Sequence, residues 1–359
     1  MTLVGPNLTI AYQIPNHQGP ERPRTSGHWT QIILGYPLEG FPMNLSPLLS
    51  RFAPALGVVL LSIAPAQAQV SLVLKHPENQ ATQTETEVKL QQTMTIMGQE
   101  IQTSSDQTIL TRQANGQRRA DGNLPVEATI EAVKGTAIIQ GMTISFDSEK
   151  PDAEADPRFK PITDSMKMIV GISYTLVFDQ TGKVVAVEGT EKALEKASQT
   201  SPELAEAAKA RFSADKIKQT ANDQFGRFPE APVRPGETWT RKEVQELGMG
   251  QTFTYEKTYE YVGPVEKDGK TLDKINVKVS SLHYSQDPNA GGPAKVTKND
   301  LKIDSSEGTL LFDRNEGRVV EGTEKQHITG SLTLEVMGQS IDAGLDLTIE
   351  EHSNIKPVK

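Results

Sequence analysis

The chain has no cysteine, so disulfide bonds, thiolate nucleophiles and cysteine metal ligands are excluded. Basic residues are also in short supply: 37 lysines and arginines stand against 46 acidic residues, which gives a net charge of −9. They form no run longer than a pair such as Arg118-Arg119. Because a nucleic-acid-binding protein needs an extended basic surface, we expect no nucleic-acid partner.

Histidine is scarce and scattered, and no motif joins it to a nucleophile. The positions after residue 68 are His76, His283, His327 and His352, and their spacing is not that of metal ligands. The acidic run from Asp147 to Asp156 lacks the central glycine and final glutamate of a calcium loop, so a solvated loop is the favoured interpretation and a metal site the alternative. We predict no metal, no cofactor and no enzymatic activity.

Long apolar runs are absent apart from residues 52–66. This run follows Arg51 and precedes Ala66-Gln67-Ala68, which is the order of a secretory signal peptide over residues 43–68, cleaved before Gln69. A membrane span is the alternative, but it needs about 20 apolar residues. We therefore expect a periplasmic or secreted protein with no transmembrane span after cleavage. Residues 1–42 are expected to be a disordered extension or to precede the true start at Met43.

Residues 69–359 are expected to form a single β-rich domain. In the last segment, Ile328 to Glu350, apolar and polar residues alternate on both sides of the tripeptide Met-Gly-Gln, as in a half-buried β-hairpin. The same tripeptide recurs at residues 97–99 and 249–251, so we interpret it as a turn, with a ligand-contacting loop as the alternative. With a four-residue loop, Ile96 would lie opposite Ile101 and Val336 opposite Ile341.

A second recurrence indicates an internal duplication. The segment VFDQTGKVVAVEGTEKA (residues 177–193) resembles LFDRNEGRVVEGTEKQH (residues 311–327). We assign the first half to residues 69–190, a helical arm to residues 191–226 and the second half to residues 227–359. The fold class expected is mainly β (α+β): a large antiparallel curved sheet or open half-barrel built from two duplicated halves, with the helical arm between them.

The helical arm contains two apolar stripes at helical spacing. Leu204 and Phe212 belong to a segment that opens with Ser201 as N-cap and Pro202 after it. Ile217 and Phe225 belong to the next segment, which ends at Gly226.

The string RFPEAPVRPGETWT (residues 227–240), together with FDQTGKVVAVEG and the Met-Gly-Gln hairpins, resembles an uncharacterised family of secreted β-rich bacterial proteins, a domain of unknown function that is frequent in planctomycetes. The resemblance implies an extracytoplasmic β-rich protein. A long antiparallel sheet with a helical arm is also similar to the open half-barrel of periplasmic lipoprotein carriers, as an analogy of fold that transfers no residue roles.

Aromatic residues make up only 5% of the chain, yet four of them alternate within one strand-like segment. They are candidates for the wall of an apolar cavity covered by the helical arm, with a filled core as the alternative. The candidate ligand-lining residues are Phe253, Tyr255, Tyr259, Tyr261, Leu204, Phe212, Ile217 and Phe225.

The first hairpin mixes polar and apolar residues on one face. Gln92 is expected to share the face of Val88 and Leu90, opposite Thr103 and Ser105, and such a face suits a wetted cavity better than a dry core. We therefore expect a non-enzymatic protein that binds or carries a lipid or other apolar small molecule. The alternative is a structural or interaction protein whose partners are proteins of the cell envelope.

Overall fold

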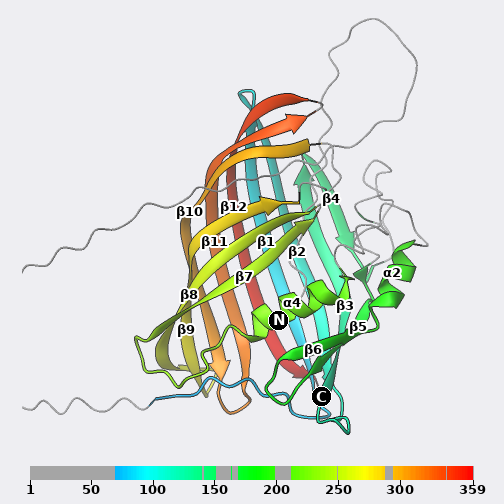
Figure 1. Ribbon diagram of the computed structural model, residues 1–359, viewed down its shortest axis with the longest axis vertical. Helices are drawn as coiled ribbons and strands as arrows, with labels where there is room; N and C mark the ends of the chain where they lie inside the picture. The colour runs from blue at the N-terminus through cyan, green and yellow to red at the C-terminus, as the bar shows by residue number, and fades with distance from the viewer. Residues whose placement is uncertain are drawn as a thin grey trace, which may run out of the picture.

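The structure is a computed structural model that describes residues 69–139, 141–150, 163, 169–198, 212–248, 250–287, 294–336 and 338–358. Strands dominate the described chain, and the longest of them reach 20 residues (Figure 1). In chain order the elements are β1 (Ala81–Ile96), β2 (Gln99–Asn115), β3 (Leu124–Ile139), β4 (Met142–Asp147), β5 (Ser173–Phe178), β6 (Val184–Glu188), α2 (Thr190–Ser198), α4 (Ala214–Phe225), β7 (Thr238–Gly248), β8 (Gln251–Lys267), β9 (Lys270–Gln286), β10 (Ala294–Asp313), β11 (Arg318–Val336) and β12 (Gln339–Val358).

The strands form one 12-stranded antiparallel sheet in the order β6-β5-β3-β2-β1-β12-β11-β10-β9-β8-β7, with β4 beside β3. The sheet remains open, and β6 and β7 are its two edges. Strands of the first half are contiguous, strands of the second half are contiguous, and β1 pairs with β12 where they meet. The expected fold class, a large open antiparallel sheet, is therefore confirmed.

The sheet curves so strongly that strands distant in its order face one another. Lys257 of β8 lies 2.8 Å from a carboxylate oxygen of Glu324 of β11, although β9 and β10 separate these strands in the sheet. Leu90 of β1 shares a core with Phe253 of β8 in the same way. One face of the sheet is thus concave and encloses an interior (Figure 1).

Alternation along the strands assigns side chains to this interior. In the first hairpin Leu90 lies opposite Ser105 and Gln92 opposite Thr103, and all four side chains are buried. The expected mixture of polar and apolar residues on one face is confirmed. Along β1 and β2, every second side chain points inward, as the pleat of a β-strand requires.

The Met-Gly-Gln tripeptide at residues 97–99 forms a turn, but a tighter one than predicted. Met97 and Gly98 both have positive φ, 52° and 81°, which is the backbone of a two-residue type I′ turn. Ile96 consequently lies opposite Gln99, and Met94 takes the place opposite Ile101 that was predicted for Ile96.

The last hairpin shows the same correction. Leu334 lies opposite Ile341, and Val336 lies opposite Gln339 at the turn. The predicted four-residue loop is wrong because Gly338, at φ 79°, permits a shorter connection. A register shift of two residues leaves every side chain on its predicted face, so the pattern of burial survives the error.

These turns lie at one end of the sheet, the upper end in Figure 1. The duplicated turns that begin at Phe178-Asp179 and Phe312-Asp313, the Phe-Asp turns, lie at the other, lower end. The two Phe-Asp turns share one stabilising device. The Asp179 carboxylate accepts hydrogen bonds from the backbone amides of Thr181 (2.8 Å) and Lys183 (3.0 Å). The Asp313 carboxylate does the same for two amides of its longer turn, both at 3.0 Å.

Helix α4 joins the two edges of the open sheet. Its Asn222 side chain accepts a hydrogen bond from the Val184 amide of β6 (2.9 Å) and donates one to the Val184 carbonyl (3.0 Å), as a neighbouring strand would. The next residue, Asp223, accepts a hydrogen bond from the backbone amide of Val244 in β7. The helix ends at Gly226 and buries Ile217, as the sequence predicted.

Several expectations concern residues outside the described chain. They concern the predicted signal peptide within residues 1–68 and the segment with Ser201, Pro202 and Leu204. Among the described residues, no helix has the length and apolar character needed to cross a membrane.

Candidate ligand-binding site

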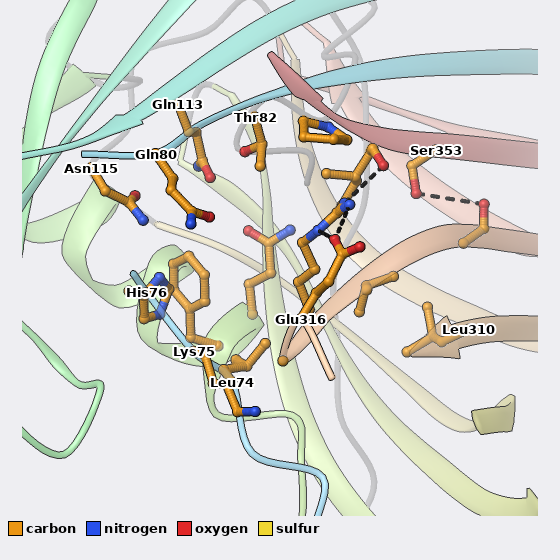
Figure 2. Close-up of a pocket in the computed structure, with 18 of the residues that line it drawn as sticks. Leu74, Lys75, His76, Gln80, Thr82, Gln113, Asn115, Leu310, Glu316 and Ser353 are labelled. Carbon is orange, nitrogen blue, oxygen red and sulfur yellow. Dashed lines mark hydrogen bonds and ion pairs between the residues drawn. The ribbon is translucent and has the colours of Figure 1, made fainter. Parts of the chain in front are cut away.

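A cavity of about 720 Å³ lies inside the lower end of the sheet (Figure 2). Five parts of the chain contribute to its wall: residues 74–82 before and at the start of β1, the end of β2, the end of α4 with the residues after it, the turn at residues 315–317 with adjoining parts of β10 and β11, and the end of β12. Both halves of the chain and the helix between them therefore form this one space.

The segment that leads into β1 closes the lower side of the cavity. Val70 pairs with Val233 through two backbone hydrogen bonds of 2.9 and 2.8 Å, and Leu72 is buried beside them. Further along, the Lys75 amide donates to the Gly317 carbonyl (2.8 Å), and the Asn115 side chain donates to the Pro77 carbonyl (2.8 Å). These bonds attach the segment to both halves of the sheet, so the cavity floor is held in place.

His76 lies in this segment and packs against two aromatic rings. Its ring centroid is 4.4 Å from that of Phe178 and 5.5 Å from that of Phe225. Burial, followed by the positive charge of Arg118, lowers the pKa of His76 to about 4, so the imidazole is neutral at neutral pH. Its buried Nε2 has no hydrogen-bond partner among the described residues.

Amide side chains line the part of the cavity next to β1 and β2. Gln113 is 9% exposed, and its Nε2 is likewise buried without a partner in the described structure. Figure 2 shows Gln80, Gln113 and Asn115 directing their amide groups toward the same space. Buried polar groups are normally hydrogen-bonded, so Gln113 marks a place where a ligand atom could bind.

Apolar side chains line the rest of the wall. They include Leu74, Phe225, Phe228, Leu310, Val319, Ile355 and Val358. A cavity of this volume with apolar walls and a few convergent polar groups has the usual character of a small-molecule site.

A buried ion cluster lies beside the cavity and includes the lining residue Glu324. Lys257 lies 2.9 Å from Glu243 and 2.8 Å from Glu324, and the Tyr259 hydroxyl donates a hydrogen bond to Glu243. Burial alone would raise the pKa of Glu243, but Lys257, Arg227 and the Tyr259 hydroxyl together hold it at about 2. Burial raises the pKa of Glu324 above its usual value. The charge of Lys257 opposes this shift, and the negative charge of Glu243 adds to it. The cluster joins β7, β8 and β11 across the interior.

The structure places the candidate ligand-lining residues in different environments. Phe253 and Tyr255 fill one core, and Tyr259 and Tyr261 fill a second one, all at 2% exposure or less. Phe212 and Ile217 are buried in a third core, between α4 and the first half of the sheet. Leu204 lies outside the described residues. Phe225 is the one candidate ligand-lining residue that belongs to the described cavity wall.

Sequence reasoning missed most of the residues that line the cavity. Its wall consists of strand ends, the residues after α4, the turn at residues 315–317 and the segment before β1, and these parts lie far apart in the sequence. One signal was available, since Gln113 and Asn115 continue the inward polar row of Thr103, Ser105 and Gln107 along β2. The described part of the chain contains no group of three histidine or acidic side chains that could hold a metal ion.

Two solved structures show remote similarity to the chain. The chain aligns over 79% of its length with lipovitellin at 8% identity and a TM-score of 0.36, and it spans 26% of the lipovitellin chain. It aligns over 80% of its length with 98% of an outer membrane channel from Pseudomonas putida F1, at 7% identity and a TM-score of 0.24. With TM-scores below 0.5, these similarities carry no argument about function. No curated protein matches the sequence significantly.

A family model matches residues 121–317, which are more than half of the chain. The match runs from the turn before β3 to the second Phe-Asp turn and therefore covers parts of both halves and the helical arm between them. The chain belongs to the family of unknown function DUF6263.

Proposed function

We propose that this protein is a non-enzymatic, extracytoplasmic binding protein or carrier for an apolar or amphipathic small molecule. The cavity of about 720 Å³ between the two halves of the sheet and α4 carries the proposal. Typical small-molecule pockets have volumes of about 300–1,000 Å³ and combine apolar walls with a few polar groups. Phe225, Phe228 and Ile355 supply such walls here, and Gln113 and His76 supply polar groups without partners in the described structure.

The extracytoplasmic location rests on the signal-peptide pattern of residues 43–68. N-terminal sequencing of the exported protein should give a start near Gln69. Exported protein that still carries residues before Arg51 would contradict this part of the proposal.

The binding function can be tested by extraction. The protein is purified under native conditions, extracted with organic solvent, and the extract analysed by mass spectrometry for lipid. We expect an apolar or amphipathic compound at close to one molecule per protein. A clean extract, together with no uptake of added lipid, would contradict the proposal.

The alternative is a structural or interaction role in the cell envelope. One observation favours it: the upper part of the interior is a packed core, in which Leu332, Leu334 and Ile328 are 2% exposed or less. In that case a clean extract would be accompanied by capture of a defined envelope protein in cross-linking experiments on intact cells.

A further inference from the structure

The charges around the cavity restrict the class of ligand that it can hold. Six charged side chains belong to the lining: Lys75, Arg227, Glu316, Arg318, Glu324 and Glu351. Each of them has a partner within the protein. A charged ligand head would have to displace one of these partners or remain buried without a counter-charge, and both are unfavourable.

The cationic groups illustrate this compensation. Arg318 donates to a Glu316 carboxylate oxygen (2.7 Å) and to the Ile355 carbonyl (2.9 Å). Lys75, which is exposed, donates to the neutral carbonyls of Asn315 (3.1 Å) and Arg314 (3.3 Å) at the cavity floor, and Figure 2 shows it on the opposite side of the lining from Gln113. An anionic head such as a carboxylate or phosphate that lies against Gln113 would therefore have to draw Arg318 away from Glu316 or remain without a cation beside it.

The buried polar atoms of the described lining that have no hydrogen-bond partner belong to neutral groups. Gln113 Nε2 is a donor, and His76 Nε2 donates or accepts according to its tautomer. The Gln113 side chain is buried, with 9% exposure, and Figure 2 places its amide group near those of Gln80 and Asn115. A hydroxyl or amide on the ligand could both accept from Gln113 and donate to a neighbouring amide oxygen.

We propose that the cavity selects amphiphiles with an uncharged hydrogen-bonding head, such as a long-chain or isoprenoid alcohol, over fatty acids, cationic lipids and anionic phospholipids. The head lies against Gln113 of β2, and the apolar chain lies along Phe225, Phe228 and Ile355. This inference rests on the proposed binding function and specifies its ligand class.

The test compares ligands that differ only in the head. Binding of hexadecanol, hexadecanoate and hexadecylamine to the purified exported protein is measured at neutral pH by displacement of a neutral fluorescent probe. We expect hexadecanol to bind at least about tenfold more tightly than either charged compound, because burying an uncompensated charge is unfavourable by well over 1.4 kcal/mol. Charged ligands that bind as tightly as the alcohol would overturn the inference and leave the binding function intact. No binding of any of the three would overturn both.

A pair of variants on the same strand tests the assigned head position. Gln113→Leu removes the donor with little change of volume and should weaken hexadecanol binding about five- to tenfold. Thr103→Val is the matched control, because Thr103 is also buried on β2 with an unpartnered hydroxyl but does not belong to the described cavity wall. Equal effects of the two variants on binding, with both folded by circular dichroism, would overturn the assignment of the head to Gln113.

Discussion

The pentapeptide Glu-Gly-Thr-Glu-Lys occurs once in each half of the chain, at residues 188–192 and 321–325, and adopts two different structures. In the first half, β6 ends at Glu188, Gly189 takes a φ of 82°, and α2 starts at Thr190. In the second half, all five residues belong to β11. The same residues thus end a strand in one place and continue it in the other.

The surroundings of the two copies account for this difference. The second copy is paired with β10 on one side and β12 on the other, and its Glu324 contacts Lys257 across the interior. The first copy lies at the edge of the sheet, where β6 pairs with β5 alone. A strand continues where neighbours satisfy its backbone on both sides, and local propensity alone does not decide the outcome.

Substitution of Lys257, which contacts Glu324 of the second copy, should have the largest effect on stability. Lys257→Met leaves Glu243 and Glu324 buried without their cation, so we expect the free energy of unfolding to fall by about 3–5 kcal/mol in chemical denaturation. Lys325→Met is the control, because that lysine of the pentapeptide contacts Glu350 on the exposed outer face and should contribute little. Similar losses in both variants would contradict a special role for the buried cluster.

Acid should weaken the same cluster. The pKa of Glu243 is about 2 in the folded protein and near 4.5 in the unfolded chain, so its stabilisation is present above pH 4.5 and is lost as the pH falls toward 2. We expect Glu243→Gln to flatten the fall in stability over this range, measured by denaturation at a series of pH values. An unchanged slope would show that other carboxylates govern the acid response.

The strand that leads to the first copy, β6, has helix α4 beside its free edge, whereas the second copy has a strand on each side. Asn222→Ala removes both hydrogen bonds to Val184 at the edge of β6, and we expect a loss of about 1–3 kcal/mol, with faster hydrogen exchange of the Val184 amide. Lys218→Ala, which removes one exposed hydrogen bond to the Val185 carbonyl, is the control and should have a smaller effect. If exchange at Val184 does not change, α4 does not act as the partner of this edge.

The glycines of the two copies, Gly189 and Gly322, should lose stability on substitution for different reasons. At Gly189 an added Cβ would have space, with the nearest atom 3.9 Å away, but the positive φ is unfavourable for alanine. We expect Gly189→Ala to destabilise the protein by about 1 kcal/mol and Gly189→Asn by less, since asparagine tolerates this conformation. Thermal unfolding measures both, and equal effects would mean that φ is not the cause.

At Gly322 the backbone is ordinary and space is the constraint. An added Cβ would lie 2.8 Å from the Ser353 hydroxyl oxygen, which can rotate away, so we expect Gly322→Ala to lose about 0.5–1 kcal/mol. The double variant with Ser353→Ala should recover most of this loss, because the two sites are in contact. Additive losses would indicate that the clash is not with this side chain.

Much of the fold follows from local pattern. Alternation located the last hairpin, β11 and β12, and assigned the inward faces of β1 and β2, and the stripe with Ile217 located α4 up to Gly226. The register at the turns escaped this reasoning, because a two-residue and a four-residue connection place the same apolar residues on the same face. Only the backbone of Met97 and Gly98 distinguishes them.

The candidate site was far less predictable. The aromatic row of β8 was a reasonable candidate, yet curvature of the sheet brings Tyr255 and Tyr259 against other strands and buries them in cores. The cavity lies instead where five distant segments converge, around His76 and Gln113. No local signal marks such a convergence, because it depends on the pairing of β1 with β12 and on the docking of α4.

The sequence by itself determined which segments are strands, which end in glycine turns and which face of each strand is apolar, because these properties depend on neighbours two to four residues away. The tertiary structure alone decided that one Glu-Gly-Thr-Glu-Lys becomes a helix start and the other a strand, that α4 joins the edges at Val184 and Val244, and that a cavity remains between the halves. Those outcomes depend on backbone and side-chain partners in other elements of the chain, such as Val244 for Asp223 and Lys257 for Glu324, which pattern within a segment does not contain.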